Sequence, residues 1–266
     1  MAIDEADVPF IMQILSAERL AVLTQLTGNA KSAIELHQET LRLGANLLNV
    51  IASIEIALRN SICENLGQFF GAPGWLISPP PPFQWRLTEK LKIAAAVDSA
   101  RRAEYAKLSQ AEKHALDGAA FPNGRPANLP HLSRAKKRRT HISVTDGKVI
   151  AELTFYIWKR IYGPDYEHSL WRPTLKKTFP DKKLKRADIA AHLEILYQAR
   201  NRLAHHEPVL HRRFDETMTS IAFIAQRLGM EKASEGAPLA GLVVEDFEGT
   251  RALAEKLHAE LNSYRI

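Results

Sequence analysis

The chain has a single cysteine, Cys63, among its 266 residues, which excludes an intramolecular disulfide. A lone free thiol is typical of a protein in a reducing compartment, so we expect a cytoplasmic protein. No apolar run approaches the roughly 18 to 20 residues that a membrane span requires, and this predicts a soluble chain with no membrane partner. The first residues, Met1 to Asp7, are partly acidic and lack the basic and apolar regions of a secretory signal.

Strand-like alternation of polar and apolar residues is also scarce. Apart from a short ambiguous piece from His141 to Thr145, almost every periodic segment repeats at the interval of a helix. We therefore predict an all-α protein. The expected helices run from about Val8 to Thr27, Ser32 to Phe70, Leu87 to Leu116, Lys148 to Ile161, Arg186 to Pro208, Arg212 to Leu228 and Phe247 to Tyr264.

The breaks between these segments suggest the domain organisation. Residues 78–82 read as an extended proline-rich spacer, and residues 117–146 are rich in Gly, Pro, Asn and basic residues, which predicts a long irregular insertion. We expect an N-terminal helix in residues 1–30, a helical domain in 31–230 with its insertion at about 117–146, and a linker with a C-terminal helix in 231–266. One helical bundle with a C-terminal helical appendage fits this pattern better than two independent domains.

The charge balance favours a polyanionic partner. The formal net charge is +6 and the pI is about 9.4, although many basic proteins do not bind nucleic acid. Solvated loops are the alternative explanation for each basic cluster. The clusters are Lys136 to Arg139, Lys176-Lys177, Lys182-Lys183 and Lys185-Arg186.

The most informative segment is Arg200-Asn201-Arg202-Leu203-Ala204-His205-His206-Glu207-Pro208, which we call the RN–H motif. It ends an amphipathic helix whose apolar stripe contains Ile189, Leu193, Leu196 and Leu203, and Arg200 falls in the same stripe. A guanidinium placed there must be compensated by a carboxylate, a carbonyl or a bound phosphate. A structural ion pair of Arg200 with Glu55 or Glu152 therefore remains an alternative to a functional site.

Helix geometry limits how this motif can work. Asn201 and His205 lie about 40° apart around an ideal helix, whereas Arg200 and His205 lie about 140° apart. One straight helix cannot aim Arg200 and His205 at the same atom. Either the helix loosens before Pro208, or two copies of the chain combine their motifs about a two-fold axis. The second option explains more.

Arginine and histidine can together cleave a phosphodiester without a metal ion. The reaction needs a base for the attacking hydroxyl, an acid for the leaving oxygen and positive charge near the phosphorane. In RNA the 2′-hydroxyl is the nucleophile, so His205 and Arg200 from two copies would suffice and would leave 2′,3′-cyclic phosphate ends. Asn201 would orient the phosphate or the imidazole, and Arg202 would bind phosphate. Capping of the helix end by Asn201 and His205 is the alternative.

The helix around residue 55 carries a second charged pair. Glu55 and Arg59 stand four residues apart, so a stabilising pair is the default interpretation. If this helix packs on the helix of Arg200, Glu55 would be the counter-charge that holds the guanidinium, and Arg59 would be a further phosphate contact. We predict no metal and no cofactor, because His205, His206, Glu207 and His211 lack the His-Glu-x-x-His spacing. Pro208 also prevents the helical display that such zinc sites need.

The RN–H motif closely resembles the signature of the Abi-like (abortive infection, AbiD/AbiF-type) proteins of the HEPN superfamily. Further pieces occur in the order typical of that family, and the resemblance covers about Lys31 to Leu228 without the loop at 117–141. Tyr156-Ile157-Trp158 departs from the Gly-x-Trp expected there. The matching pieces are Glu55-x-x-x-Arg59-Asn60, Gly147-Lys148-Val149, Glu152-Leu153-Thr154-Phe155, Trp158, Leu170-Trp171 and Phe179-Pro180.

The resemblance implies a HEPN-like helical bundle that is usually a homodimer and serves bacterial phage defence or toxin-like growth arrest, in some cases silenced by an antitoxin protein or RNA. Catalytic members are metal-independent endoribonucleases, and Arg200 and His205 match their two catalytic positions, while Asn201 matches the polar residue beside the arginine. Two alternatives stay open: a non-catalytic RNA-binding or regulatory HEPN module, and a metal-dependent or nucleotidyl-transferring toxin partner that uses its bundle for assembly. Trp158 and Trp171 are interpreted as core aromatics.

Overall fold

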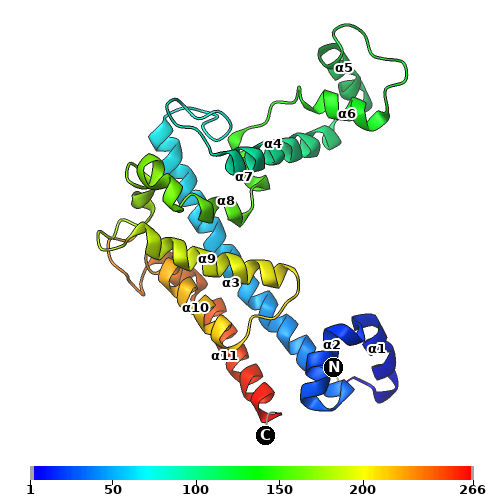
Figure 1. The fold of residues 1–266 in the computed structure, drawn as a ribbon, viewed down its shortest axis with the longest axis vertical. Helices are drawn as coiled ribbons and strands as arrows, with labels where there is room; N and C mark the ends of the chain where they lie inside the picture. Colours follow the sequence, from blue (N-terminus) through cyan, green and yellow to red (C-terminus); the bar gives the residue numbers. More distant parts are fainter. Residues whose placement is uncertain (1–2, 265–266) are drawn as a thin grey trace. The chain divides into compact units, whose positions relative to one another are not determined.

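The computed structural model describes residues 3–264, and these residues form helices and no strand (Figure 1). The all-α prediction is confirmed. Contacts divide the chain into two compact units: unit 1 contains residues 1–61, 162–164 and 176–266, and unit 2 contains residues 62–161 and 165–175. The expected division into 1–30, 31–230 and 231–266 stays a prediction.

The N-terminal segment of unit 1 is two helices rather than the single one expected from Val8 to Thr27. A short 3-10 turn, Glu5–Asp7, leads into α1 (Val8–Leu15), and α2 spans Ala17–Thr27. Ser16 separates them because its backbone has a positive φ of 67° and its hydroxyl accepts the backbone N–H of Arg19 at 3.3 Å, which is an N-cap for α2. Val8, Leu20 and Ile34 form a small core here.

Helix α3 (Ala30–Phe70) is the longest helix of the described part. By length and composition alone it could cross a membrane, since one 18-residue window has a mean hydropathy of 1.4, a test that the core helix of a soluble protein also passes. A Cβ added at Gly44 would lie 3.2 Å from Cδ2 of Leu203, so the glycine allows α3 and the RN–H motif to approach closely, and α3 continues unbroken through it. The expected stripe is fully buried: Leu47, Ile51, Ile54, Leu58, Ile62 and Leu66.

Three helices complete unit 1: α9 (Arg186–Ala204), α10 (His211–Ala225) and α11 (Pro238–Ser263). Helix α9 packs on α10, and α10 packs on α11. Helix α11 begins nine residues before the expected start at Phe247, and Pro238 at its first position suits a helix N-terminus. It buries Leu239, Val243, Ala254, Leu257 and Leu261, so it is part of the core of unit 1 rather than a loose appendage.

Unit 2 contains more, shorter helices than expected. The predicted helix from Leu87 to Leu116 is broken into α4 (Leu87–Lys107) and α5 (Gln110–Ala120), because Ser109 and Glu112 form a capping box that starts a new helix. The predicted helix from Lys148 to Ile161 is likewise divided into α7 (Asp146–Glu152) and α8 (Phe155–Arg160). Trp158 and Trp171 are buried, as predicted for core aromatics.

The insertion at 117–146 is more ordered than predicted. Besides the end of α5, it contains α6 (His131–Arg139). The carboxylate of Asp117 accepts hydrogen bonds from Nε and Nη2 of Arg138 at 2.6 and 2.7 Å and also pairs with Arg134. Part of the basic cluster at 136–139 is therefore used inside unit 2, since Arg138 is only 4% exposed.

Candidate functional site

The RN–H motif forms the last turn of α9 and the reversal that follows it. The backbone N–H of Glu207 donates to the carbonyl of Arg202 at 2.9 Å, and that of His206 donates to Leu203 at 3.0 Å. His206 has a positive φ of 56°, so the end of α9 is a Schellman motif with histidine where glycine is usual. Pro208 follows directly. His205 is therefore the C-cap, and its exposed imidazole stands at the point where the helix ends.

An ion pair closes this turn. Nη1 of Arg202 lies 3.0 Å from Oε2 of Glu207, and Nη2 of Arg202 donates to the carbonyl of Pro208 at 3.4 Å. Glu207 thus closes the turn through its ion pair with Arg202. Arg202 was predicted to bind phosphate. In the structure its guanidinium forms an ion pair with Glu207, so phosphate binding by Arg202 would have to compete with that carboxylate.

Arg200 and Arg59 act on the same carboxylate. Burial raises the pKa of Glu55, and the positive charges of Arg200 and Arg59 oppose that rise. The charge of Arg200 on α9 therefore reaches Glu55 on α3, and the counter-charge role of Glu55 stays a prediction. All three side chains are half-buried. The guanidinium of Arg200 is therefore partly desolvated on α9.

Arg200 and His205 differ in their surroundings. Arg200 is half-buried beside α3, whereas His205 is exposed at the C-cap, with φ of −96° and ψ of 12°. Asn201 and Arg202 line a cleft of about 340 Å³ between α9 and α10, together with Arg213 and Glu216. Neither Arg200 nor His205 lines that cleft. The structure thus groups Asn201 with Arg202, and Arg200 with Glu55 and Arg59.

Two arginines near the motif were missed by the sequence analysis. Nη1 of Arg19, on α2, donates to the carbonyl of His206 at 3.3 Å, and Arg213 shares the cleft of Asn201. The run His211-Arg212-Arg213 was a visible sign of the second, but nothing in the sequence marks Arg19. The cluster Lys185-Arg186 lies at the opposite end of α9, about 22 Å from Arg200 along the helix axis. Charge near the motif comes from arginines rather than from those lysines.

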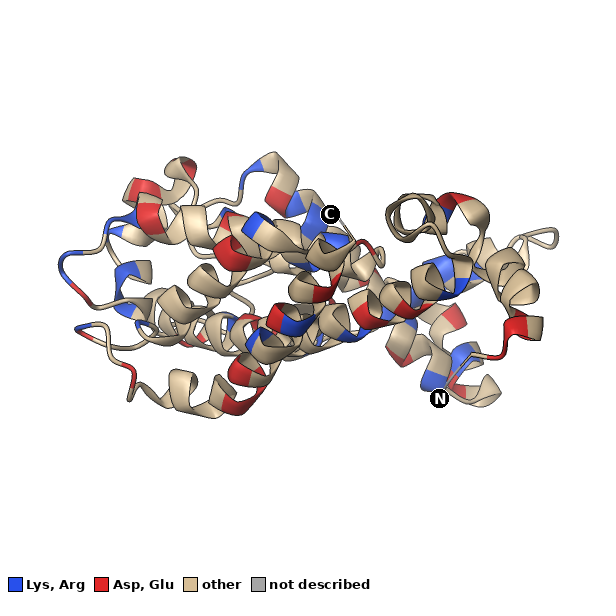
Figure 2. Cartoon of the chain, turned by 90° about the horizontal axis from the view of Figure 1, so that it is seen from below, with Lys and Arg blue, Asp and Glu red and all other residues tan. Residues whose placement is uncertain are grey.

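Acidic residues accompany these basic ones. Figure 2 shows Lys and Arg interspersed with Asp and Glu along the helices, rather than in a region of one sign. Among the residues that the structure describes, no three His, Cys, Asp or Glu side chains come together in a group that could hold a metal ion. Guanidinium groups at the end of α9 thus lie beside carboxylates, and an anion bound there would compete with Glu207 for Arg202.

Comparison of the chain with family models, with curated proteins and with solved structures gives no match.

Proposed function

We propose that this chain is an Abi-like protein of the HEPN type that binds RNA and cleaves it without a metal ion, as a homodimer. The observation that supports the proposal best is that a half-buried arginine and an exposed histidine lie five residues apart at the end of α9. Arg200 is half-buried and its charge acts on Glu55, and a partly desolvated guanidinium acts more strongly on a phosphorane than it would in water. Five residues later, the Schellman end of α9 leaves the imidazole of His205 exposed to substrate.

The homodimer is proposed because one copy separates these two groups. Arg200 lies beside α3, and His205 projects from the helix end. A two-fold axis near the end of α9 would bring His205 of one copy toward Arg200 of the other and supply a second imidazole, so that base and acid come from different copies. Asn201 and Arg213, which share one cleft, would then contact the RNA backbone beside the scissile phosphate.

A cleavage assay with purified protein and end-labelled RNA in EDTA tests the proposal. Cleavage should survive chelation, produce 2′,3′-cyclic phosphate ends and fall at least about a hundredfold in His205→Ala and Arg200→Gln. His131→Ala is the matched control, because His131 is exposed on α6 and lies outside the motif. RNA binding without cleavage by the wild-type protein would support the non-catalytic alternative, and activity only with added metal would support the toxin-partner alternative.

Mixing variants tests the composite site. Arg200→Gln and His205→Ala are each inactive alone in this scheme, but a co-expressed mixture contains dimers that hold one intact Arg200 and one intact His205. If one arginine and one histidine from opposite copies are enough for a cut, the mixture regains part of the wild-type rate. A mixture as inactive as its components, in a preparation shown to contain mixed dimers, would show that one imidazole is not enough and that a cut needs His205 of both copies.

A further inference from the structure

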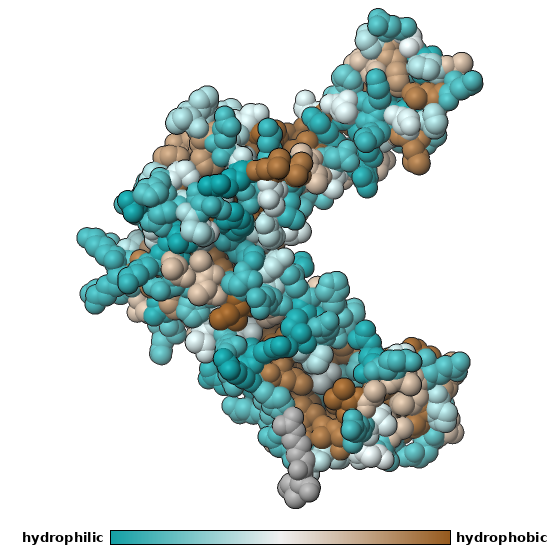
Figure 3. Space-filling view, in the orientation of Figure 1, coloured by the Kyte–Doolittle hydropathy of each residue, from teal (hydrophilic) through white to brown (hydrophobic). Residues whose placement is uncertain are grey.

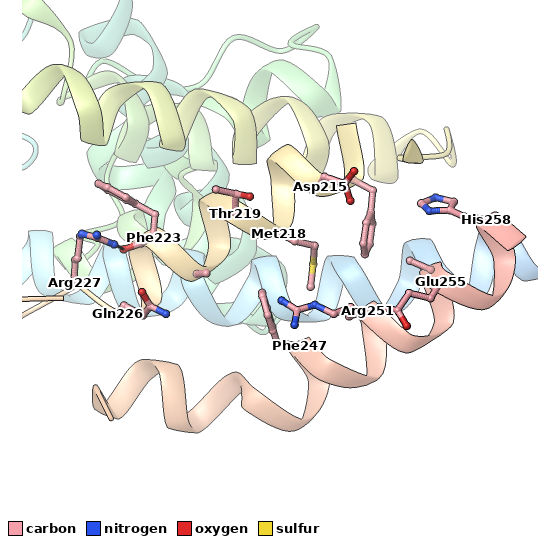
Figure 4. Close-up of a pocket in the computed structure, with 13 residues that line it drawn as sticks. Asp215, Met218, Thr219, Phe223, Gln226, Arg227, Phe247, Arg251, Glu255 and His258 are labelled. Atoms are coloured by element: carbon pink, nitrogen blue, oxygen red, sulfur yellow. Dashed lines mark hydrogen bonds between the residues drawn. The ribbon is translucent and has the colours of Figure 1, made fainter. Parts of the chain in front are cut away.

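The largest cleft of unit 1 that we describe lies away from the RN–H motif, between α10 and α11. Its volume is about 580 Å³, within the range of roughly 300 to 1,000 Å³ that is typical of small-molecule sites. Figure 4 shows its side chains projecting from both helices into the space between them. The apolar part of the lining includes Phe214, Met218, Phe223 and Phe247.

Two arginines line this cleft, Arg227 at one end and Arg251 nearer the middle (Figure 4). The guanidinium of Arg227 lies 4.3 Å from the ring centre of Phe223, and that of Arg251 lies 5.0 Å from the ring centre of Phe247. Each arginine thus lies within cation–π distance of an aromatic ring. Nη1 of Arg227 donates to the carbonyl of Phe223 at 3.3 Å and Nη1 of Arg251 lies 3.4 Å from Oε2 of Glu248, so an anion would use the remaining N–H groups. Nε of Arg227 is buried and has no hydrogen-bond partner within the described residues. An unsatisfied buried donor is costly, so a bound acceptor at this end would stabilise it.

Negative charge lies at the other end of the cleft. Figure 4 shows Asp215 and Glu255 near His258, beyond Arg251 from the end that contains Arg227 and Gln226. Carboxylates accept hydrogen bonds and do not donate them, so this end suits a ligand group with N–H donors. Phe214 lies edge-on to His258, with ring centres 5.8 Å apart, and adds an aromatic wall.

We propose that the α10–α11 cleft binds a nucleoside phosphate with a guanine base. The phosphate would pair with Arg227 and Arg251, since guanidinium groups bind phosphate through parallel hydrogen bonds. The base would lie on the phenylalanine rings, because aromatic surfaces stack on any base. At the far end, the adjacent N1–H and N2–H donors of guanine match the two oxygens of one carboxylate, either Asp215 or Glu255. Uracil presents carbonyl oxygens on both sides of its single N–H, and a carboxylate repels these.

Isothermal titration of the full-length protein with GMP, UMP and inorganic phosphate tests the site. GMP should bind at least about tenfold more tightly than UMP, because a hydrogen bond to a charged group contributes enough free energy for that factor. Arg251→Gln should weaken the binding of GMP at least tenfold. Asp215→Asn combined with Glu255→Gln should weaken the binding of GMP until its affinity approaches that of UMP. The affinity for UMP should change little. Arg212→Gln is the matched control, since Arg212 lies on α10 but outside the cleft and is 91% exposed in its side chain.

Equal affinities for GMP and UMP, absence of GMP binding, or unchanged GMP binding in a folded Arg251→Gln protein would each overturn the proposal. The source of the nucleotide is decided by comparing GMP with a guanosine-ended RNA trinucleotide. Tight binding of GMP indicates a free nucleotide, and much tighter binding of the trinucleotide indicates the end of an RNA chain. The site is independent of the proposed ribonuclease, so His205→Ala should bind GMP as the wild type does, whether or not RNA is cleaved.

Discussion

Nη1 of Arg202 and Oε2 of Glu207 lie 3.0 Å apart across the turn that ends α9, so the carboxylate of Glu207 offsets the positive charge of Arg202 within the RN–H motif. Both side chains are partly exposed, at 34% and 53%, and such pairs contribute at most about 1 kcal/mol to stability. The pair therefore matters more for the charge that RNA meets than for folding.

Glu207→Gln should tighten RNA binding. The substitution releases Arg202 for phosphate and removes a negative charge beside His205, while the free energy of unfolding changes by less than about 1 kcal/mol. Fluorescence anisotropy with labelled RNA at two salt concentrations measures the effect, and the tightening should be larger at low salt. Glu231→Gln, in the loop before α11, is the control; weaker binding in Glu207→Gln would mean that the turn needs the ion pair to hold its shape.

His206→Gly should stabilise the protein. His206 adopts a positive φ of 56°, a conformation that costs a side-chain-bearing residue about 1 kcal/mol and glycine almost nothing. The free energy of unfolding in urea should rise by about that amount, with RNA cleavage retained, because His206 has no assigned chemical role. His205→Gly, at a φ of −96°, should instead lower stability. A loss of stability in His206→Gly would show that its side chain makes a contact worth more than the backbone strain.

Glu55→Gln separates a positioning role from a structural ion pair. Burial raises the pKa of Glu55, so the native state favours the neutral acid more than the unfolded chain does. The contribution of Glu55 to stability is complete below its ordinary pKa of 4.5 and declines as the pH rises through its native pKa. The neutral glutamine should therefore leave the free energy of unfolding at pH 7 unchanged or slightly higher, while RNA cleavage falls because Arg200 loses its counter-charge.

A different outcome would identify Arg200 and Glu55 as a structural pair. In that case Glu55→Gln would lower the free energy of unfolding by about 3 kcal/mol or more, as expected when one partner of a buried ion pair is removed. RNA cleavage would then fall only in proportion to the fraction of unfolded protein. An NMR titration gives a second readout: Arg200→Gln should raise the pKa of Glu55 further, since the positive charge of Arg200 opposes the rise.

Stability should fall in mild acid through His258. The backbone N–H of His211 donates to Nε2 of His258 at 3.0 Å, which requires a neutral imidazole on α11. Burial lowers the pKa of His258, the nearby His211 imidazole lowers it further, and Asp215 opposes both. A lowered native pKa gives a contribution that is complete above the ordinary value of 6.5 and is lost as the pH falls.

Urea unfolding at pH 8 and pH 5 measures this dependence. His258→Gln should show a smaller difference between the two pH values than the wild type. Some dependence should remain, because burial also lowers the pKa values of His37 and His192. An unchanged difference in His258→Gln would show that protonation of His258 is not coupled to folding.

Asp117→Asn should open the segment from α5 to α6. Hydrogen bonds from Arg138 and Arg134 hold the pKa of Asp117 well below its usual range, so the carboxylate stabilises this segment except in strong acid. Hydrogen exchange should become faster in residues 110–140, and Arg139, which also pairs with Asp98, should not compensate. Because unit 1 contains the RN–H motif, RNA cleavage should be retained. Protection equal to wild type would mean that apolar contacts alone hold the segment.

Helix content and the two apolar stripes could be predicted from the sequence because they depend on local periodicity. The stripe from Leu47 to Leu66 and the one from Ile189 to Leu203 are buried as expected. The breaks at Ser16 and Ser109 were missed, although serine is a preferred N-cap, because the apolar pattern continues across both. The order within 117–146 was missed since it depends on Asp117 meeting two arginines more than fifteen residues away.

On the N-terminal helices α1 and α2, several apolar side chains remain on the surface. Composition alone could not predict which ones. Phe10, Ile14 and Val22 are 64%, 65% and 76% exposed, and Figure 3 shows hydrophobic atoms on the surface where these helices lie. A helical wheel predicts which residues share a face, but it does not say which faces find a partner.

By itself the sequence determined that the chain is helical, where α3 and α9 bury their stripes, and that Arg200 and His205 stand at the end of a helix. Only the tertiary structure decided that the charge of Arg200 acts on Glu55, that Glu207 pairs with Arg202, and that α10 and α11 enclose a cleft lined by arginines and carboxylates. Periodicity records the neighbours of a residue within one helix, whereas these relationships join residues from different turns or helices, and their distances are set by packing.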